Sequence, residues 1–382
     1  MHFELSDEQK AFVQIAAEFA SNELAPHAAR WDAEHHFPVD VIRRAGTLGL
    51  CGIYADTDAG GMGLSRLDAA LIFEQLAGGC TATAAYISIH NMCTAMVTRF
   101  GNAAQKAAFG SRMASGEWLA SYCLTEPGAG SDAAALKTRA RRDGDDYVLS
   151  GSKMFISGAG ATDILIVMAR TADTGARGIS AFIVPARSAG IRYGKNEEKM
   201  GWNAQPTRAI TFDDVRVPAS QRLGAEGDGF RFAMQGLDGG RLNIASCSLG
   251  TAAAALRAAH RYLKDRQQFG QPLADFQALQ FRLADMATEL QAARLMVWHS
   301  ASRLDAGDSD ATLHCAMAKR FATDAGFRVC NEALQLHGGY GYLRDFPLER
   351  MLRDVRVHQI LEGTNEIMRV IAARKLLDKD SL

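Results

Sequence analysis

The sequence predicts a multi-domain α+β protein in which an N-terminal helical domain, an antiparallel β domain and a C-terminal helical domain follow one another. The first third of the chain has apolar residues at helical spacing. The middle has short β-branched runs separated by turn residues, and the last third has long alanine-rich helical patterns. With 382 residues, the chain is long enough for two or three domains. We place the domain boundaries at 1–118, 119–226 and 227–382.

The N-terminal domain is predicted to be helical from its first capping signal onward. Ser6 and Gln9 fit a capping box, and Phe12, Ile15 and Phe19 then recur on one helical face. Further helices are predicted over 39–48, 67–77, 81–100 and 105–114.

The middle domain is predicted to be a small antiparallel sheet or barrel. Its strands are expected at 119–123, 137–142, 147–149, 163–169, 179–184, 209–212 and 215–217. The strongest turn signal is Asp143-Gly144-Asp145, which is typical of a tight hairpin. From about residue 229 the chain is helical again. Helices over 230–266, 273–304 and 311–337 suit a C-terminal four-helix bundle.

Composition argues against several classes of function. The 42 basic and 43 acidic residues give no electrostatic footprint for nucleic acid or an anionic membrane, and no apolar run is long enough to span a bilayer. The N-terminal residues lack a targeting pattern, which predicts a bacterial cytoplasmic chain or a mature mitochondrial-matrix chain. The seven cysteines include no Cys-x-x-Cys pair and are expected to be reduced and buried, and no metal site is predicted.

One carboxylate near the C-terminus is a candidate general base. Glu362 follows an apolar run and precedes Gly363, which permits a tight turn. Thr364 or Asn365 can then cap a last helix. Partial burial would raise the pKa of Glu362, while the helix N-terminus would favour its anion. On local grounds alone, a carboxylate that merely complements the helix dipole is the more common case.

Two loops in the middle domain can approach a flat or phosphorylated ligand. Residues 122–132 contain Gly128 and Gly130, which allow close backbone approach, between the hydroxyls of Thr125 and Ser131. Residues 153–158 place Phe155 at the end of a strand, where it can stack on a heterocycle. Alone, each pattern also fits an ordinary loop or a core aromatic.

Taken together, four motifs make the chain resemble the acyl-CoA dehydrogenase family over nearly its whole length. They are Thr-Glu-Pro-Gly-Ala-Gly-Ser-Asp at 125–132, Arg-Gln-Gln-Phe-Gly at 266–270, Gln-Leu-His-Gly-Gly-Tyr-Gly-Tyr at 335–342 and Glu-Gly-Thr-Asn-Glu at 362–366. Their order and spacing match the family's helix–sheet–helix organisation.

The resemblance implies FAD as cofactor and an acyl-CoA as substrate. Cofactor contacts would come from the chain's own middle domain and last helix, and from segments that reach the FAD of a neighbouring subunit. These residues are Tyr122, Cys123, Leu124, Thr125, Gly130, Ser131, Phe155, Ile156, Ser157, Thr364, Asn365 and Glu366, and then Arg266, Phe269, Gln277, Gln335, Leu336, His337, Gly338 and Gly339. Substrate contacts would come from Ser131, Asp238, Gly239, Gly240, Arg241, Gly363 and Arg374.

In this family a carboxylate removes the substrate α-proton while the flavin takes hydride from the β-carbon. By that resemblance, Glu362 is the expected base. Some members carry the base immediately before the arginine matched by Arg241, but here that position is Gly240, which has no acid group. The resemblance also implies electron-transfer flavoprotein as electron acceptor and a homotetramer built as a dimer of dimers.

Within the family, the resemblance is to members that act on short branched acyl groups. It rests on residues 155–160, 201–207, 239–248 and 357–363, with Asp238 standing where Asn is expected. We expect isobutyryl-CoA first and 2-methylbutyryl-CoA second, with a short straight chain as a further alternative. Two rival functions remain open at this point. One is an acyl-CoA oxidase, and the other is a non-catalytic relative that binds nucleic acid.

Overall fold

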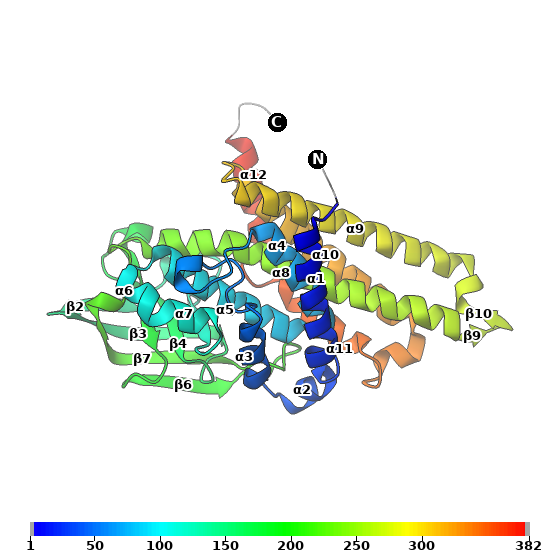
Figure 1. Cartoon of the computed structure of the whole chain (residues 1–382), viewed down its shortest axis with the longest axis horizontal. Helices are drawn as coiled ribbons and strands as arrows, with labels where there is room; N and C mark the ends of the chain where they lie inside the picture. The colour runs from blue at the N-terminus through cyan, green and yellow to red at the C-terminus, as the bar shows by residue number, and fades with distance from the viewer. Residues whose placement is uncertain (1–3, 379–382) are drawn as a thin grey trace.

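The computed structural model describes residues 4–378, so the first three residues of the N-terminal segment considered above lie outside it. Figure 1 shows most strands at one end of the long axis and the short β9–β10 hairpin (Gln267–Gln268 and Gln271–Pro272) at the other. The long helix α8 (Gly229–Asp265) runs between these ends. The fold thus has the predicted order of helices, sheet and helices.

The N-terminal helices form where the sequence places capping and apolar signals. They are α1 (Asp7–Phe19), α2 (Ala28–Glu34), α3 (Val39–Thr47), α4 (Arg66–Gly79), α5 (Thr81–Phe100), α6 (Ala103–Gln105) and α7 (Ser111–Ala114). The predicted capping box is confirmed, because Ser6 Oγ accepts the Gln9 N–H and the Gln9 side chain accepts the Ser6 N–H, both at 3.1 Å.

The middle strands form one eight-stranded sheet. In sequence they are β1 (Ala120–Cys123), β2 (Arg139–Asp143), β3 (Asp146–Ser157), β4 (Ile164–Arg170), β5 (Ile179–Pro185), β6 (Ile191–Asn196), β7 (Thr207–Pro218) and β8 (Arg222–Leu223). The order across the sheet is β6-β7-β3-β2-β4-β5-β8, with β1 also paired to β4. The predicted hairpin at Gly144 joins β2 to β3, with the Gly144 φ at +64°.

The sheet differs from the expected antiparallel one in two respects. β1 and β2 both pair with β4 in parallel, so the sheet is mixed. The two separate strands expected at 209–212 and 215–217 are one strand, β7, and the edge strand β6 was not predicted.

Both faces of β4 are buried, which accounts for its unbroken apolar run. Ile164, Ile166 and Met168 pack with apolar residues from α5 and from the start of α8. Leu165 and Val167 face the second core layer, together with residues of β3, β5 and β7. Strand β1 lies directly beside β4, so the chain that leaves β1 starts from a rigid position.

A buried histidine joins the helical domain to β1. His90 on α5 is fully buried, and its Nδ1 accepts the backbone N–H of Ala120 at 3.1 Å. Its Nε2 therefore carries the proton and donates to the Met113 carbonyl at 2.9 Å. Burial lowers the pKa of His90 to about 4, so the ring stays neutral at ordinary pH.

The C-terminal part consists of α8, α9 (Gln277–Asp305), α10 (Ala311–Leu336), α11 (Leu348–Arg356) and α12 (Asn365–Leu377). Helix α9 begins later than predicted, because Leu273–Asp275 forms a 3₁₀ turn. Helix α11 was not predicted. Alanines and aliphatic residues of α8, α9 and α10 form one core.

Two general findings concern residues 4–378. None of their helices is long and apolar enough to cross a membrane, and they include no group of three or more His, Cys, Asp or Glu residues placed to hold a metal ion. All seven cysteines are free and buried, as predicted.

Candidate active site

Glu362 lies in a left-handed turn between the 3₁₀ turn Val357–Gln359 and α12. Its φ is +52° and that of Gly363 is +91°. Thr364 caps α12 by accepting the Ile367 N–H at 3.3 Å, so one of the two predicted caps is confirmed. A non-glycine residue with positive φ is strained, and such strain is concentrated at functional sites. Phe155 (+58°) and Phe269 (+53°), two other predicted site residues, share this conformation.

The Glu362 carboxylate lies against the backbone of α8 at Gly240. A Cβ built at Gly240 would lie 3.0 Å from the Glu362 Cδ and would overlap Oε2. Oε2 is buried and has no hydrogen-bond partner in the described part of the chain. Gly240 therefore provides the volume that this carboxylate occupies.

Three cations from three elements surround this carboxylate. Burial raises the pKa of Glu362 to about 7, against the lowering effects of Lys319, Arg241 and Arg66. A carboxylate with a pKa near neutral pH can exchange a proton under ordinary conditions. The site thus combines an unpartnered oxygen with a pKa suited to a general base.

Arg241, on α8, is anchored beside Glu362. Its Nη1 donates to Asp238 Oδ1 at 2.6 Å, and its Nε donates to the Glu362 carbonyl at 3.4 Å. The other oxygen of Asp238 accepts the Thr312 hydroxyl at 2.8 Å. Both oxygens of Asp238 are thus engaged within the chain, so its side chain orients Arg241, and its contact with the substrate stays a prediction.

Tyr122 brings strand β1 to the same site. Its hydroxyl is buried without a partner in the described residues, and its pKa is raised by burial and by the nearby Glu362. The next two residues, Cys123 and Leu124, are buried in the core on opposite faces of the sheet. Their side chains are therefore structural, and only their backbones are free to meet a cofactor.

The loop after β1 is fastened to β3. The Met154 N–H donates to the Thr125 carbonyl at 2.9 Å, and the buried Lys153 ammonium donates to Glu126 at 2.8 Å and to the Leu124 carbonyl at 3.1 Å. Beyond this anchor, a Cβ at Gly128 or Gly130 would meet nothing within 4 Å, and Ser131 is exposed. The loop is thus rigid at its base and open at its glycines.

Phe155 follows this anchor on β3 and points outward. Its ring is 62% exposed, whereas Ile156 is buried in the sheet core and Ser157 is half-buried. Of the three residues expected along a flat cofactor, the structure presents Phe155 directly, while the Ile156 side chain points into the core.

The segments predicted to serve a neighbouring subunit meet each other at the β9–β10 end of the molecule. They line an open hollow of about 770 Å³ that includes Arg266 and Gln335–Gly339. Arg266 lies over the Tyr340 ring at 5.7 Å, and His337 stacks on Tyr262 at 4.3 Å. Phe269 and Gln277 lie outside the lining, and Phe269 is 93% exposed.

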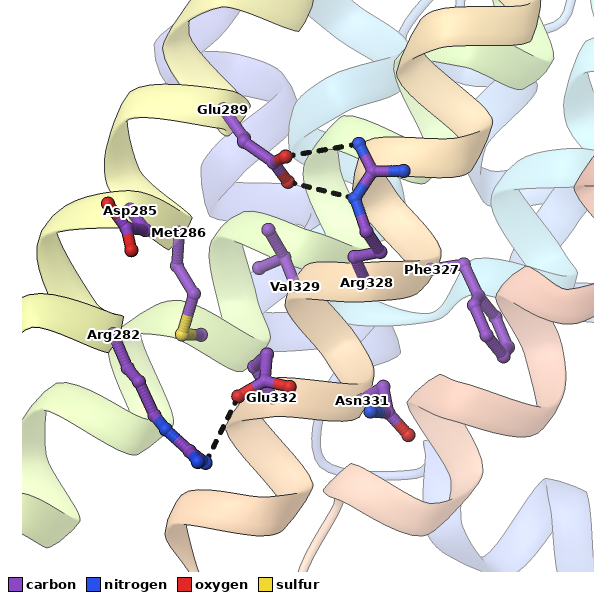
Figure 2. Close-up of a pocket in the computed structure, with 9 residues that line it drawn as sticks. All are labelled: Arg282, Asp285, Met286, Glu289, Phe327, Arg328, Val329, Asn331 and Glu332. Carbon is purple, nitrogen blue, oxygen red and sulfur yellow. Dashed lines mark hydrogen bonds and ion pairs between the residues drawn. The ribbon is translucent and has the colours of Figure 1, made fainter. Parts of the chain in front are cut away.

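This end of the molecule is far from the sheet that carries Phe155 (Figure 1). A second, smaller hollow of about 270 Å³ lies between α9 and α10 and shares Arg282 with the first. Figure 2 shows it framed by two ion pairs, Arg282–Glu332 at 3.3 Å and Arg328–Glu289 at 3.1 Å. Glu362 lines neither hollow.

The start of α12 presents a mixture of free and engaged groups. Glu366 is exposed, but the Asn365 amide is buried and fully used by Lys319, Thr323 and Asp324 of α10. Any contact of Asn365 with a phosphate would therefore come through its backbone N–H. Arg374 is exposed near the far end of α12, about 14 Å along the axis from the helix start.

Comparison with known proteins identifies the family of the chain. The N-terminal, middle and C-terminal domains of acyl-CoA dehydrogenase match residues 6–117, 121–215 and 227–377. The chain belongs to the acyl-CoA dehydrogenase family. This family is flavin-dependent. The outline of three successive domains predicted from the sequence is therefore confirmed at the level of the family.

Two relatives and one solved structure are similar to the chain over nearly its whole length. The chain is 55% identical to the mitochondrial isobutyryl-CoA dehydrogenase of Bos taurus, over 98% of this chain and 90% of that protein. It is 52% identical to the corresponding protein of Dictyostelium discoideum, over 98% and 91%. The butyryl-CoA dehydrogenase structure from Megasphaera elsdenii superposes with a TM-score of 0.96 at 40% identity, covering 99% of this chain and all of that chain.

Two residues near Glu362 were not found from the sequence. Lys319 occupies a buried stripe of α10 beside Cys315 and Ala322, and a lysine on such a stripe was the one available signal. Arg66 lies over the Tyr54 ring at 3.6 Å, and only the folded chain brings it to α8.

Proposed function

We propose that this acyl-CoA dehydrogenase converts isobutyryl-CoA to methacrylyl-CoA, with Glu362 as the base that removes the α-proton. The observation that carries the proposal is the unpartnered Glu362 carboxylate against Gly240, with a pKa near 7. The two isobutyryl-CoA dehydrogenases above support the acyl group.

The chain supplies a proton acceptor and an oxyanion donor. A proton α to a thioester is weakly acidic, so its removal needs a positioned base and stabilisation of the developing enolate oxygen. The Glu362 backbone N–H donates no hydrogen bond within residues 4–378 and is available to the thioester oxygen. Arg241 and the Tyr122 hydroxyl are buried beside this site, and such burial strengthens electrostatic interactions.

The site residues fit FAD, which we propose as the cofactor. Gly128 and Gly130 leave open space for a pyrophosphate, and the exposed Phe155 ring offers a face to the isoalloxazine. When bound, FAD would accept at N5 the hydride that leaves the substrate β-carbon. The expected observation is a yellow protein whose flavin absorbance is bleached anaerobically by isobutyryl-CoA. A colourless protein that does not take up FAD would contradict the assignment.

Acyl selectivity provides the first quantitative prediction. We expect kcat/KM to be highest for isobutyryl-CoA, about tenfold lower for 2-methylbutyryl-CoA or butyryl-CoA, and lower still for octanoyl-CoA, because a change of one methyl group in an apolar pocket is worth about 1–3 kcal/mol. Leu361, beside the base, packs against the N-terminal core and would limit the length of the acyl group. Steady-state kinetics with the four thioesters test this order, and a preference for octanoyl-CoA would disprove it.

We also propose a homotetramer in which each FAD is completed by a neighbouring subunit. Within one chain, the sheet that carries Phe155 and the β9–β10 hairpin that follows Arg266 lie toward opposite ends of the long axis (Figure 1), which supports a cofactor site with contributions from two subunits. We expect Arg266→Ala and Glu362→Gln homo-oligomers each to be nearly inactive. Co-assembly of the two variants should restore about half of the wild-type activity per mixed pair, because one site then receives an intact residue from each chain.

Absence of recovery in verified mixed oligomers would place each site within a single chain. Arg282→Ala serves as the control, because Arg282 lines the same hollow as Arg266.

We propose electron-transfer flavoprotein as the electron acceptor. Turnover that consumes O₂ in the absence of that flavoprotein would favour an acyl-CoA oxidase instead.

We propose the bacterial cytoplasm or the mitochondrial matrix as the location, because the two named relatives are mitochondrial proteins. Cell fractionation tests this. Salt-sensitive DNA binding would favour the nucleic-acid-binding alternative.

A further inference from the structure

Lys319 is a buried lysine that contacts the Glu362 turn directly. It projects from α10 and has no exposed surface. Its Nζ donates to the Gly363 carbonyl at 2.8 Å and to the Asn365 side-chain oxygen at 3.0 Å. Two of its three N–H donors therefore hold Gly363 and Asn365, the first and third residues after Glu362.

The second of these contacts is itself firmly held. The Asn365 amide donates to Asp324 Oδ1 at 2.8 Å and to the Thr323 hydroxyl at 3.0 Å. Asp324 also accepts from Gln359, which precedes the turn, at 2.8 Å. Both ends of the Glu362 turn are thus tied to one face of α10, which can offset the cost of its left-handed backbone.

Lys319 differs from the two arginines near Glu362 in how its charge is used. Arg241 is paired with Asp238 at 2.6 Å, and Arg66 lies on the Tyr54 ring. Lys319 has no carboxylate within 4.0 Å among residues 4–378. The charged groups that act on it are Glu362, Asp324, Glu366 and Arg241, and burial lowers its pKa to about 8. Among these groups, Glu362 has the largest opposing effect: its attraction for the Lys319 ammonium raises the Lys319 pKa and so partly offsets the lowering by burial.

We propose that Lys319 is a positioning residue of the desaturation reaction: its ammonium holds the left-handed Glu362–Gly363 turn and favours the anionic form of the Glu362 carboxylate. This inference rests on the proposed role of Glu362 and deepens it. It adds that a residue of α10 supports the base, which itself lies in the turn before α12.

Two variants separate the tether from the charge. Lys319→Met keeps the length of the side chain and removes both charge and donors, whereas Lys319→Gln removes the charge and keeps an N–H₂ group. The measurement is the rate of anaerobic flavin reduction by isobutyryl-CoA in the holoenzyme between pH 6 and pH 9.5.

For both variants we expect the acid limb of the pH profile to move up by about one pH unit, because loss of a nearby cation raises the pKa of a carboxylate. That shift alone lowers the rate at pH 7 by about fivefold. Lys319→Met should in addition lose about tenfold at the high-pH plateau, because its turn is released, while Lys319→Gln recovers most of the plateau.

The matched control is Lys199→Met. Lys199 is half-buried, its pKa is likewise lowered to about 8 by burial, and it donates to the Gln205 carbonyl at 2.9 Å. Its loss should leave the acid limb in place. An unshifted acid limb in both Lys319 variants would overturn the proposal, and so would loss of FAD and fold in both, which would make Lys319 purely structural. The proposed function fails separately, if Glu362→Gln reduces its flavin at the wild-type rate.

Discussion

Replacing Glu362 with Gln should lower the rate of flavin reduction by isobutyryl-CoA by about 10³- to 10⁴-fold, the upper range for loss of a general base. The amide keeps the shape of the side chain and fills the volume beside Gly240, but it cannot accept the α-proton. FAD content and binding of the substrate should be retained. Stopped-flow absorbance at the flavin band measures the rate, and equilibrium titration with a product analogue measures binding.

The pH dependence of kcat/KM tests whether Glu362 is the group that must lose its proton for activity. Since burial raises the pKa of Glu362 to about 7, its anion forms as the pH rises through 7, and kcat/KM of the wild-type enzyme should rise with it. The Gln variant should show no such limb.

Asp354→Asn is the matched control for the loss of a buried carboxyl group. Burial raises the pKa of Asp354 to about 7 as well, but this group accepts the Trp202 N–H at 2.6 Å, away from Gly240. The asparagine oxygen can still accept that hydrogen bond, so flavin reduction should stay within about threefold of wild type. Equal losses in the two variants would mean that Glu362 acts through stability rather than chemistry.

Replacing Gly240 with Ala should lower the rate of flavin reduction by about 10²-fold with little change in FAD content. The new methyl group would occupy the place of Glu362 Oε2, so the carboxylate must move, and displacements of about 1 Å cost rates of this order. The KM for the thioester should change less than kcat, because the methyl group displaces the Glu362 carboxylate, which acts in proton removal.

Gly236→Ala tests whether the effect is local. Gly236 lies one turn earlier on α8, and a Cβ there would meet Met92 Cγ at 3.4 Å, an ordinary van der Waals distance. Alanine is also the better helix former, so this variant should be at least as stable as wild type. A comparable loss of activity in both variants would point to α8 packing instead of displacement of the base.

Local signals predicted much of the fold. Helix α5 begins and ends where the sequence places it, at Thr81 and Phe100, because an apolar periodic run is bounded there by glycine-containing segments. Strand β6 was missed because its polar residues and Gly194 carry little strand preference, and it is held by pairing with β7. The parallel pairing of β1 with β4 joins residues about forty positions apart, so no local pattern reveals it.

The site was predictable where a motif carried it and unpredictable where only the folded chain assembles it. Glu362 was identified from its turn and its resemblance, and the structure adds the reason for its pKa. Lys319, on a different helix, meets it only through packing of α10 on α12. The resemblance could not show that the Asp238 and Asn365 side chains are already engaged, because hydrogen-bond partners are a property of the fold.

The single volume between Gly240 and Glu362 also constrains how this enzyme family can diverge. By the resemblance described above, an acid immediately before the arginine matched by Arg241 would stand at position 240 on α8 and enter that volume from the other side. A side chain at 240 overlaps the present position of the Glu362 carboxylate, so a second acid at 240 would force that carboxylate to move. Exchange of the acid between the two chain positions therefore requires this volume to be vacated from one side when it is filled from the other.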